Sequence, residues 1–129
     1  MKYVYTILVA ILFIGCSSTK YVKEDALLYY GKTPCLGKCP VFDMYVFDDG
    51  KVLYEGLKNV DLLGIHEFNL TAEEVKNIKQ ELEEINFSSE ERLRRDLPNT
   101  VLKYKGKKLS TQSNEQVKEL TVLLDKIKK

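Results

Sequence analysis

The sequence has no apolar run long enough to cross a bilayer as an α-helix. A membrane-spanning helix needs about 20 consecutive apolar residues, and the apolar run near the start of the chain, from Tyr3 to Gly15, is shorter. A single basic residue, Lys2, precedes this run, and the polar segment 17–20 follows it. A basic start, a short apolar middle and a small residue at the cut are typical of a secretory signal peptide. Residues 1–15 are therefore predicted to direct export.

Histidine is nearly absent, because His66 is the only one in the chain. A metal site with several histidines is therefore excluded. A Ser-His-Asp hydrolase has little support, since no serine elbow accompanies that histidine. Neighbouring glutamates such as Glu73 and Glu74 lie where helix capping explains them, so a glycosidase-like carboxylate pair is a weak alternative. The sequence favours a binding or structural module over an enzyme, and it predicts no cofactor.

The chain also lacks an excess of charge of either sign. It carries 20 basic and 19 acidic residues, and loss of Lys2 with the signal peptide would make these numbers equal. A neutral mature chain gives no reason to expect a nucleic-acid partner. Internal repeats and low-complexity tracts are absent as well. The remaining length fits one domain with a single core, predicted over residues 26–129.

Cys16 directly follows the small residue Gly15, and this arrangement is typical of a bacterial lipoprotein signal. In such signals the thiol receives a diacylglyceryl group, and cleavage leaves the cysteine as an acylated first residue. Phe13 stands where these signals usually carry leucine. Acyl chains contribute about 0.8 kcal/mol for each buried CH₂, so several of them hold a protein permanently on a membrane.

These features predict a lipoprotein of the bacterial cell envelope, anchored to the inner or the outer membrane through a lipid on Cys16. Residues 16–25 are interpreted as the lipidated N-terminus and a short tether, because the segment is polar and has no periodicity. An ordinary cleaved signal, or an uncleaved anchor with an unmodified thiol at Cys16, is the alternative.

The two other cysteines, Cys35 and Cys39, form an even pair once Cys16 is lipidated. Disulfides persist outside the cytoplasm, and a loop flanked by two prolines and turning at Gly37 can bring two cysteines together. A structural disulfide is the main prediction. Two alternatives remain open: a thiol-redox pair, and a Cu(I) site formed by Cys35, Cys39 and His66, with Met44 nearby.

Short apolar and alternating segments predict an antiparallel sheet. The segment 41–47 is apolar on both faces, which indicates a central strand. Asp49-Gly50 is a strong signal for a two-residue hairpin of type I′, and Gly106 marks a second hairpin. The expected strands are residues 27–30, 41–47, 51–55, 65–70, 100–104 and 108–111.

Two amphipathic helices complete the expected fold. The first begins after Thr71, which forms a capping box with Glu74, and its apolar stripe is Val75, Ile78, Leu82 and Ile85. The second follows the possible cap 113–116, and its stripe is Val117, Leu120, Leu124 and Ile127. A short helix over residues 88–96, capped by Ser88 and Glu91, is also expected. The predicted class is α+β, an antiparallel sheet of five to six strands covered by two helices.

The chain resembles a family of bacterial domains filed as domain of unknown function 6438. The resemblance covers roughly residues 26 to 128 and combines a Cys-x-Gly-x-Cys-Pro motif, an Asp-Gly turn, a Tyr-x-Gly ending and an Asp-x-Pro-x-Thr signature. The matching residues are Cys35, Gly37, Cys39, Pro40, Asp49, Gly50, Tyr54, Gly56, Val60, Gly64, Asp96, Pro98 and Thr100. Members are often lipoproteins, and the resemblance implies no established activity.

The sequence therefore predicts an envelope-anchored domain that binds something, either an envelope protein or a ligand. The alternative from another class is a thiol-redox or copper-handling protein that uses Cys35 and Cys39.

Overall fold

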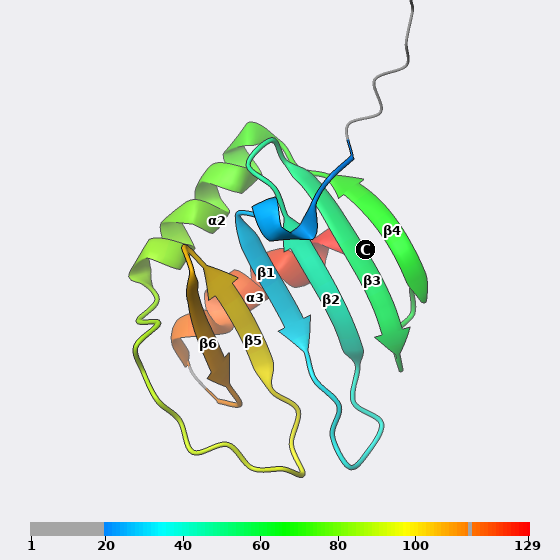
Figure 1. Ribbon diagram of the computed structural model, residues 1–129, viewed down its shortest axis with the longest axis vertical. Helices are drawn as coiled ribbons and strands as arrows, with labels where there is room; N and C mark the ends of the chain where they lie inside the picture. Colours follow the sequence, from blue (N-terminus) through cyan, green and yellow to red (C-terminus); the bar gives the residue numbers. More distant parts are fainter. Residues whose placement is uncertain (1–19, 114) are drawn as a thin grey trace, which may run out of the picture.

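The computed structural model describes residues 20–113 and 115–129. The predicted signal peptide and the predicted lipidation site Cys16 lie outside these residues. The described part is a six-stranded antiparallel sheet with two α-helices on one face (Figure 1), which confirms the predicted α+β class.

The strands follow the sequence prediction closely, with small shifts at their ends. The strand order across the sheet is β4-β3-β2-β1-β5-β6, and every pair of neighbours is antiparallel. The strands are β1 (Leu28–Lys32), β2 (Val41–Val46), β3 (Lys51–Lys58), β4 (Gly64–Asn69), β5 (Thr100–Tyr104) and β6 (Lys107–Thr111).

Strands β1 and β2 occupy the middle of the sheet, so the prediction of a central strand at 41–47 is confirmed. Tyr30 of β1 lies opposite Met44 of β2 on one side and opposite Leu102 of β5 on the other. All three side chains are fully buried. Alternate residues of a strand point to the same face, so this register directs an apolar row toward the helices.

The two hairpin turns differ from each other, and the predicted type I′ turn at Asp49-Gly50 is wrong. The amide of Gly50 donates to the carbonyl oxygen of Phe47, and Gly50 has a φ of 89°. Asp48 and Asp49 occupy the centre of this turn without positive φ. The loop therefore has three residues, a type I turn followed by a glycine bulge. The two-residue turn with positive φ at both positions is Lys105-Gly106.

Helix α2 (Ala72–Glu84) begins as predicted. The Thr71 hydroxyl accepts from the amide of Glu74 at 3.2 Å, and the Glu74 carboxylate accepts from the amide of Thr71 at 2.7 Å. This reciprocal pair is the predicted capping box. The predicted apolar stripe, from Val75 to Ile85, is buried against the sheet.

Helix α3 (Lys118–Ile127) begins later than predicted and without the predicted cap. A 3₁₀ turn, η3 (Glu115–Val117), precedes it, and the N-cap residue of α3, Val117, makes no side-chain capping hydrogen bond. The Ser113 hydroxyl instead donates to the carboxylate of Glu91. The buried residues Leu120 and Leu124 lie on the predicted stripe.

The core lies between the sheet and the two helices, as Figure 1 shows for α3 behind β1 and β2. Polar groups join the same layers at their margins. The Tyr30 hydroxyl donates to Asp125 of α3, and the Tyr104 hydroxyl donates to Glu83 of α2. The core residues that are fully buried include Leu28, Tyr30, Met44, Val46, Val52, Leu102, Leu120 and Leu124.

The segment before β1 packs on the opposite face of the sheet. The Tyr21 ring lies 4.9 Å from that of Phe47, and its hydroxyl donates to Asp49. Lys23, in the 3₁₀ turn η2 (Lys23–Asp25), pairs with Glu55 at 3.0 Å. This part of the predicted tether thus contacts the domain, because an aromatic ring and a lysine stem both carry apolar surface.

The predicted short helix over residues 88–96 is wrong. These residues form turns and irregular backbone. Glu91 does not cap a helix, because its carboxylate accepts hydrogen bonds from Thr111, Gln112 and Ser113 at the end of β6.

In the part of the chain that the structure describes, no helix has the length and apolar character that a membrane span requires.

Candidate functional site

The candidate site is built around the disulfide between Cys35 and Cys39. Their Cα atoms are 5.8 Å apart, within the ordinary range for a disulfide. The predicted bond is therefore present. It closes the loop between β1 and β2, and both cysteines are half-buried. The Asn59 side chain donates to the carbonyl oxygen of Cys39 at 3.1 Å, which joins the disulfide-bonded loop to the end of β3.

The disulfide-bonded loop also joins the segment that precedes β5. The amide of Thr33 donates to the carbonyl oxygen of Asn99 at 3.0 Å, and the amide of Asn99 donates to the Thr33 hydroxyl at 2.9 Å. The amide of Leu36 donates to the carbonyl oxygen of Asp96 at 3.5 Å. Two motifs that lie about 60 residues apart in the sequence, Cys-x-Gly-x-Cys-Pro and Asp-x-Pro-x-Thr, thus form one end of the sheet.

We call this end the loop end, and define it as residues 33–40 and 92–99. Figure 1 shows both segments at the lower edge of the sheet, away from the point at which the described chain begins. Strand β1 runs between the two ends, since Leu28 follows the N-terminal segment and Lys32 leads into the disulfide-bonded loop. The loop end and the N-terminus therefore lie at opposite ends of the strands.

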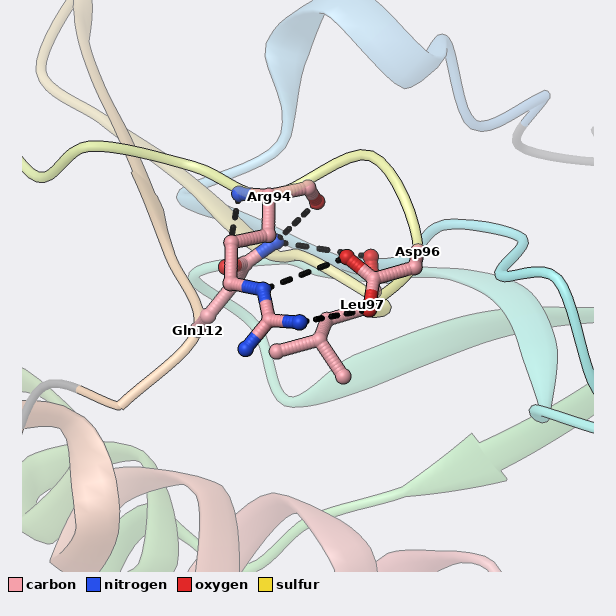
Figure 2. Close-up of polar contacts among 4 residues, drawn as sticks. All are labelled: Arg94, Asp96, Leu97 and Gln112. Carbon is pink, nitrogen blue, oxygen red and sulfur yellow. Dashed lines mark hydrogen bonds and ion pairs between the residues drawn. The ribbon is translucent and has the colours of Figure 1, made fainter.

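A set of side-chain bonds centred on Gln112 fixes the segment 94–99 (Figure 2). The Gln112 side chain accepts from the amide of Arg94 at 3.0 Å and donates to the Arg94 carbonyl oxygen at 2.7 Å. It also donates to the side chain of Asn99 at 2.8 Å. Arg94 in turn holds Asp96 through two bonds, of 2.8 and 3.3 Å. These bonds replace the helical hydrogen bonds that the sequence led us to expect.

Glu91 adds a second set of contacts to the same region. Its carboxylate accepts from the Thr111 hydroxyl and from the amide of Gln112. These hydrogen bonds, first of all the one from Thr111, hold the pKa of Glu91 below its usual value. The ionised carboxylate is thus the form that fits this position.

Exposed leucines lie on the loop end. Leu36, at the tip of the disulfide-bonded loop, is 85% exposed, and Leu97 and Leu93 are 41% and 38% exposed. A single exposed leucine is ordinary on a protein surface. The bond from the Leu36 amide to the Asp96 carbonyl oxygen joins the two segments that carry these leucines, and the disulfide and the Gln112 bonds fix the segments. The three leucines therefore give the loop end exposed apolar side chains.

The structure does not assemble the alternative copper site. The sulfur atoms of Cys35 and Cys39 are bonded to each other, so neither is a thiolate. The His66 ring lies on β4 and bonds the carbonyl oxygen of Leu63 at 2.8 Å. Within residues 20–113 and 115–129, no three or more His, Cys, Asp and Glu side chains are grouped so that they could hold a metal ion.

Sequence reasoning found the cysteine pair and the Asp-x-Pro-x-Thr residues, but it missed Gln112 and Asn99. Nothing in the sequence marks either residue, because each acts through a contact with a distant segment. Sequence reasoning also assigned no role to Arg94, which the structure places in the bonds that fix the loop end.

Comparison with known proteins gives a family for this chain. The family model described as "Domain of unknown function (DUF6438)" matches residues 26–129, which include every element from β1 to α3. No curated protein and no solved structure matches the chain.

Proposed function

This chain belongs to the DUF6438 family of domains of unknown function, and we propose that it is a binding module, anchored to the bacterial envelope through a lipid on Cys16, that presents its loop end to a protein partner. The observation that carries the proposal is the meeting of the two sequence motifs at one rigid end of the sheet, where Leu36 is 85% exposed.

The position of the N-terminus supports the orientation in this proposal. Only three residues separate Cys16 from Lys20, where the described chain begins. A chain extends by at most about 3.5 Å for each residue, so a lipid on Cys16 keeps Lys20 within roughly 15 Å of the membrane surface. The described chain begins at the end of the sheet opposite the loop end (Figure 1). The loop end then points away from the membrane, where a partner has access to it.

The chemistry of the loop end suits a protein partner. Exposed apolar side chains supply the buried centre of an interface, and surrounding polar groups supply its rim. Here Leu36, Leu93 and Leu97 provide the apolar part, and Arg94 and Asp96 lie beside them. Loops fixed in advance lose little conformational entropy on binding.

Two measurements test this proposal. The intact mass of the protein extracted from membranes should correspond to residues 16–129 plus acyl chains, and a mass without acyl chains would contradict the anchor. A photo-crosslinking amino acid at position 36 should then join the protein to one discrete partner in cells. The same amino acid at Val122, which is also exposed but lies on α3, is the matched control. Equal products from both positions, or none from position 36, would overturn the proposed binding surface.

A thiol-redox role is the second candidate function, and partial exposure of the disulfide favours it. A redox catalyst passes through a dithiol state, whereas a structural disulfide stays closed at envelope potentials. Labelling with a maleimide, in cells lysed without reductant, separates the two functions. We expect no labelling at Cys35 or Cys39. Labelling of a substantial fraction of the molecules would support the redox role instead.

A further inference from the structure

A small polar pocket lies between the end of β1, the start of β5 and the start of α3. Its volume is about 220 Å³, and Lys32, Thr100, Thr111, Glu115, Lys118 and Thr121 are among the residues that line it. The pocket is separate from the exposed leucines of the loop end. It differs from an ordinary surface depression in one respect, which is the lysine in its wall.

Lys32 is half-buried, and its ammonium group donates to the Thr100 hydroxyl at 2.6 Å. No carboxylate forms an ion pair with Lys32 in the described part of the chain. Burial lowers the pKa of Lys32, Lys128 lowers it further, and only Asp125 opposes them. Placing a cation in this position is costly without an anionic partner.

Lys32 and Thr100 together have more hydrogen-bond donors than the bond between them uses. An ammonium group has three hydrogens and a hydroxyl has one. The bond between Lys32 and Thr100 uses one ammonium hydrogen, which leaves two on Lys32 and one on Thr100. By contrast, the hydroxyls of Thr111 and Thr121 donate to Glu91 and to the carbonyl oxygen of Lys118. Lys32 and Thr100 are thus the pair with hydrogens to offer.

The other charges that line the pocket favour a small anion. Lys118 adds a positive charge, and Glu115, 3.7 Å from Lys118, offsets it. Helix α3 begins here, and the N-terminal end of a helix carries a partial positive charge. The residues that line the pocket therefore carry one net positive charge, centred on Lys32, while the carboxylates of Glu91 and Asp125 and the ammonium group of Lys128 lie beyond the lining.

We propose that this pocket binds a carboxylate group, with one oxygen on the Lys32 ammonium and the other on the Thr100 hydroxyl. A carboxylate has one negative charge and two acceptor oxygens in one plane, which matches one cation and one neighbouring hydroxyl. A phosphate group carries more negative charge than one half-buried lysine can balance. The carboxylate belongs either to a small organic acid or to the C-terminus of a peptide. This inference depends neither on the lipid anchor nor on the leucine surface.

The inference also gives a role to Thr100, the last residue of the Asp-x-Pro-x-Thr motif. The motif positions Thr100 at the first residue of β5, directly opposite Lys32 of β1. Thr100 is buried, and a strand position alone does not require its hydroxyl.

The test is a titration of the full-length chain, labelled with ¹³C and ¹⁵N and purified in detergent, followed by NMR. The probes are acetate, N-acetyl-alanyl-alanine with a free carboxylate, the same dipeptide as its carboxamide, and inorganic phosphate. We expect saturable shifts at Lys32 and Thr100 with acetate or the free dipeptide, and a rise in the pKa of Lys32, read from its ¹³Cε shift. Tighter binding of the dipeptide than of acetate identifies a chain terminus, and the reverse identifies a small acid. Equal binding of the carboxamide, or tighter binding of phosphate, would overturn the proposal.

Variants locate the site. Lys32→Gln should raise the dissociation constant at least tenfold, and Thr100→Val should raise it severalfold while keeping the shape of the side chain. Thr100→Ser retains the hydroxyl and should bind as the unmodified protein does. Lys108→Gln removes an exposed lysine of β6 that does not line the pocket, and it serves as the control for net charge. Equal weakening by Lys108→Gln, or unchanged binding in Thr100→Val, would show that the pocket does not bind as proposed.

Discussion

The carbonyl oxygen of Gly50 accepts a hydrogen bond of 2.7 Å from the amide of Leu70, so the β2–β3 turn is fixed to the residue that precedes the capping box of α2. A Cβ atom added to Gly50 would lie 2.5 Å from the carbonyl oxygen of Leu70. Two independent requirements therefore act on Gly50: a positive φ, and a close approach between two backbone segments.

The first prediction separates these two requirements. Gly50→Ala should destabilise the protein more than Gly106→Ala, by at least about 1 kcal/mol. Both glycines have positive φ, so both variants bear that conformational cost. Only Gly50 lies against other backbone, because a Cβ at Gly106 would meet no atom within 4 Å. Chemical denaturation of the full-length chain measures the difference. Equal losses would mean that the contact with Leu70 adjusts without cost.

A second prediction concerns the disulfide. Replacing both Cys35 and Cys39 with serine should lower the free energy of unfolding by about 2 kcal/mol, the chain-entropy value for so short a loop. The core lies between the sheet and the helices, away from this loop, so the circular dichroism spectrum should keep its folded form. Unfolding of the double variant would show that the loop end is needed for the fold itself.

The third prediction concerns alkaline pH and Tyr30. Burial raises the pKa of Tyr30 well above its ordinary value, and Asp125 raises it further. Above pH 10 the unfolded chain therefore loses a proton that the folded chain keeps. Stability that is complete below pH 10 should fall at higher pH, by up to about 1.4 kcal/mol for each pH unit from this one residue. In Tyr30→Phe the same decline, followed by denaturation at several pH values, should be shallower. An unchanged slope would assign the decline to other groups.

The fourth prediction tests the bonds that fix the loop end. Gln112→Ala removes the acceptor of the Arg94 amide and the donor to Asn99. Hydrogen exchange at the Arg94 amide should therefore accelerate at least tenfold, while exchange in β2 stays unchanged. Ser113→Ala is the matched control, because Ser113 adjoins Gln112 and its hydroxyl donates to Glu91. Similar acceleration in both variants would mean that Gln112 has no special role.

The sequence predicted those elements whose signals are local. The signals for α2 are the capping box of Thr71 and the apolar stripe from Val75 to Ile85, which lie close together in the sequence. The helix begins where these signals predict. Alternation and length identified all six strands. The type of the turn before β3 could not be predicted in the same way. Asp48-Asp49-Gly50 fits a two-residue or a three-residue loop, and the register of the two strands decides between them.

The prediction of a helix over residues 88–96 was wrong because residues in this segment bond to partners that are distant in the sequence. Its polar residues have helical capping patterns, but Glu91 and Arg94 bond to groups at the end of β6. The pocket beside Lys32 could not be predicted from the sequence for the same reason. Lys32 and Thr100 are 68 residues apart, and only the pairing of β1 with β5 brings them together.

The position of β1 in the middle of the sheet determines when the domain can fold. Strand β1 is the first to be synthesised, yet one of its neighbours is β5, and α3 at the end of the chain covers the core. Contacts of such high sequence separation form slowly. The β1–β4 half cannot complete its core during synthesis, and the nascent chain stays without a finished core until Leu124 emerges.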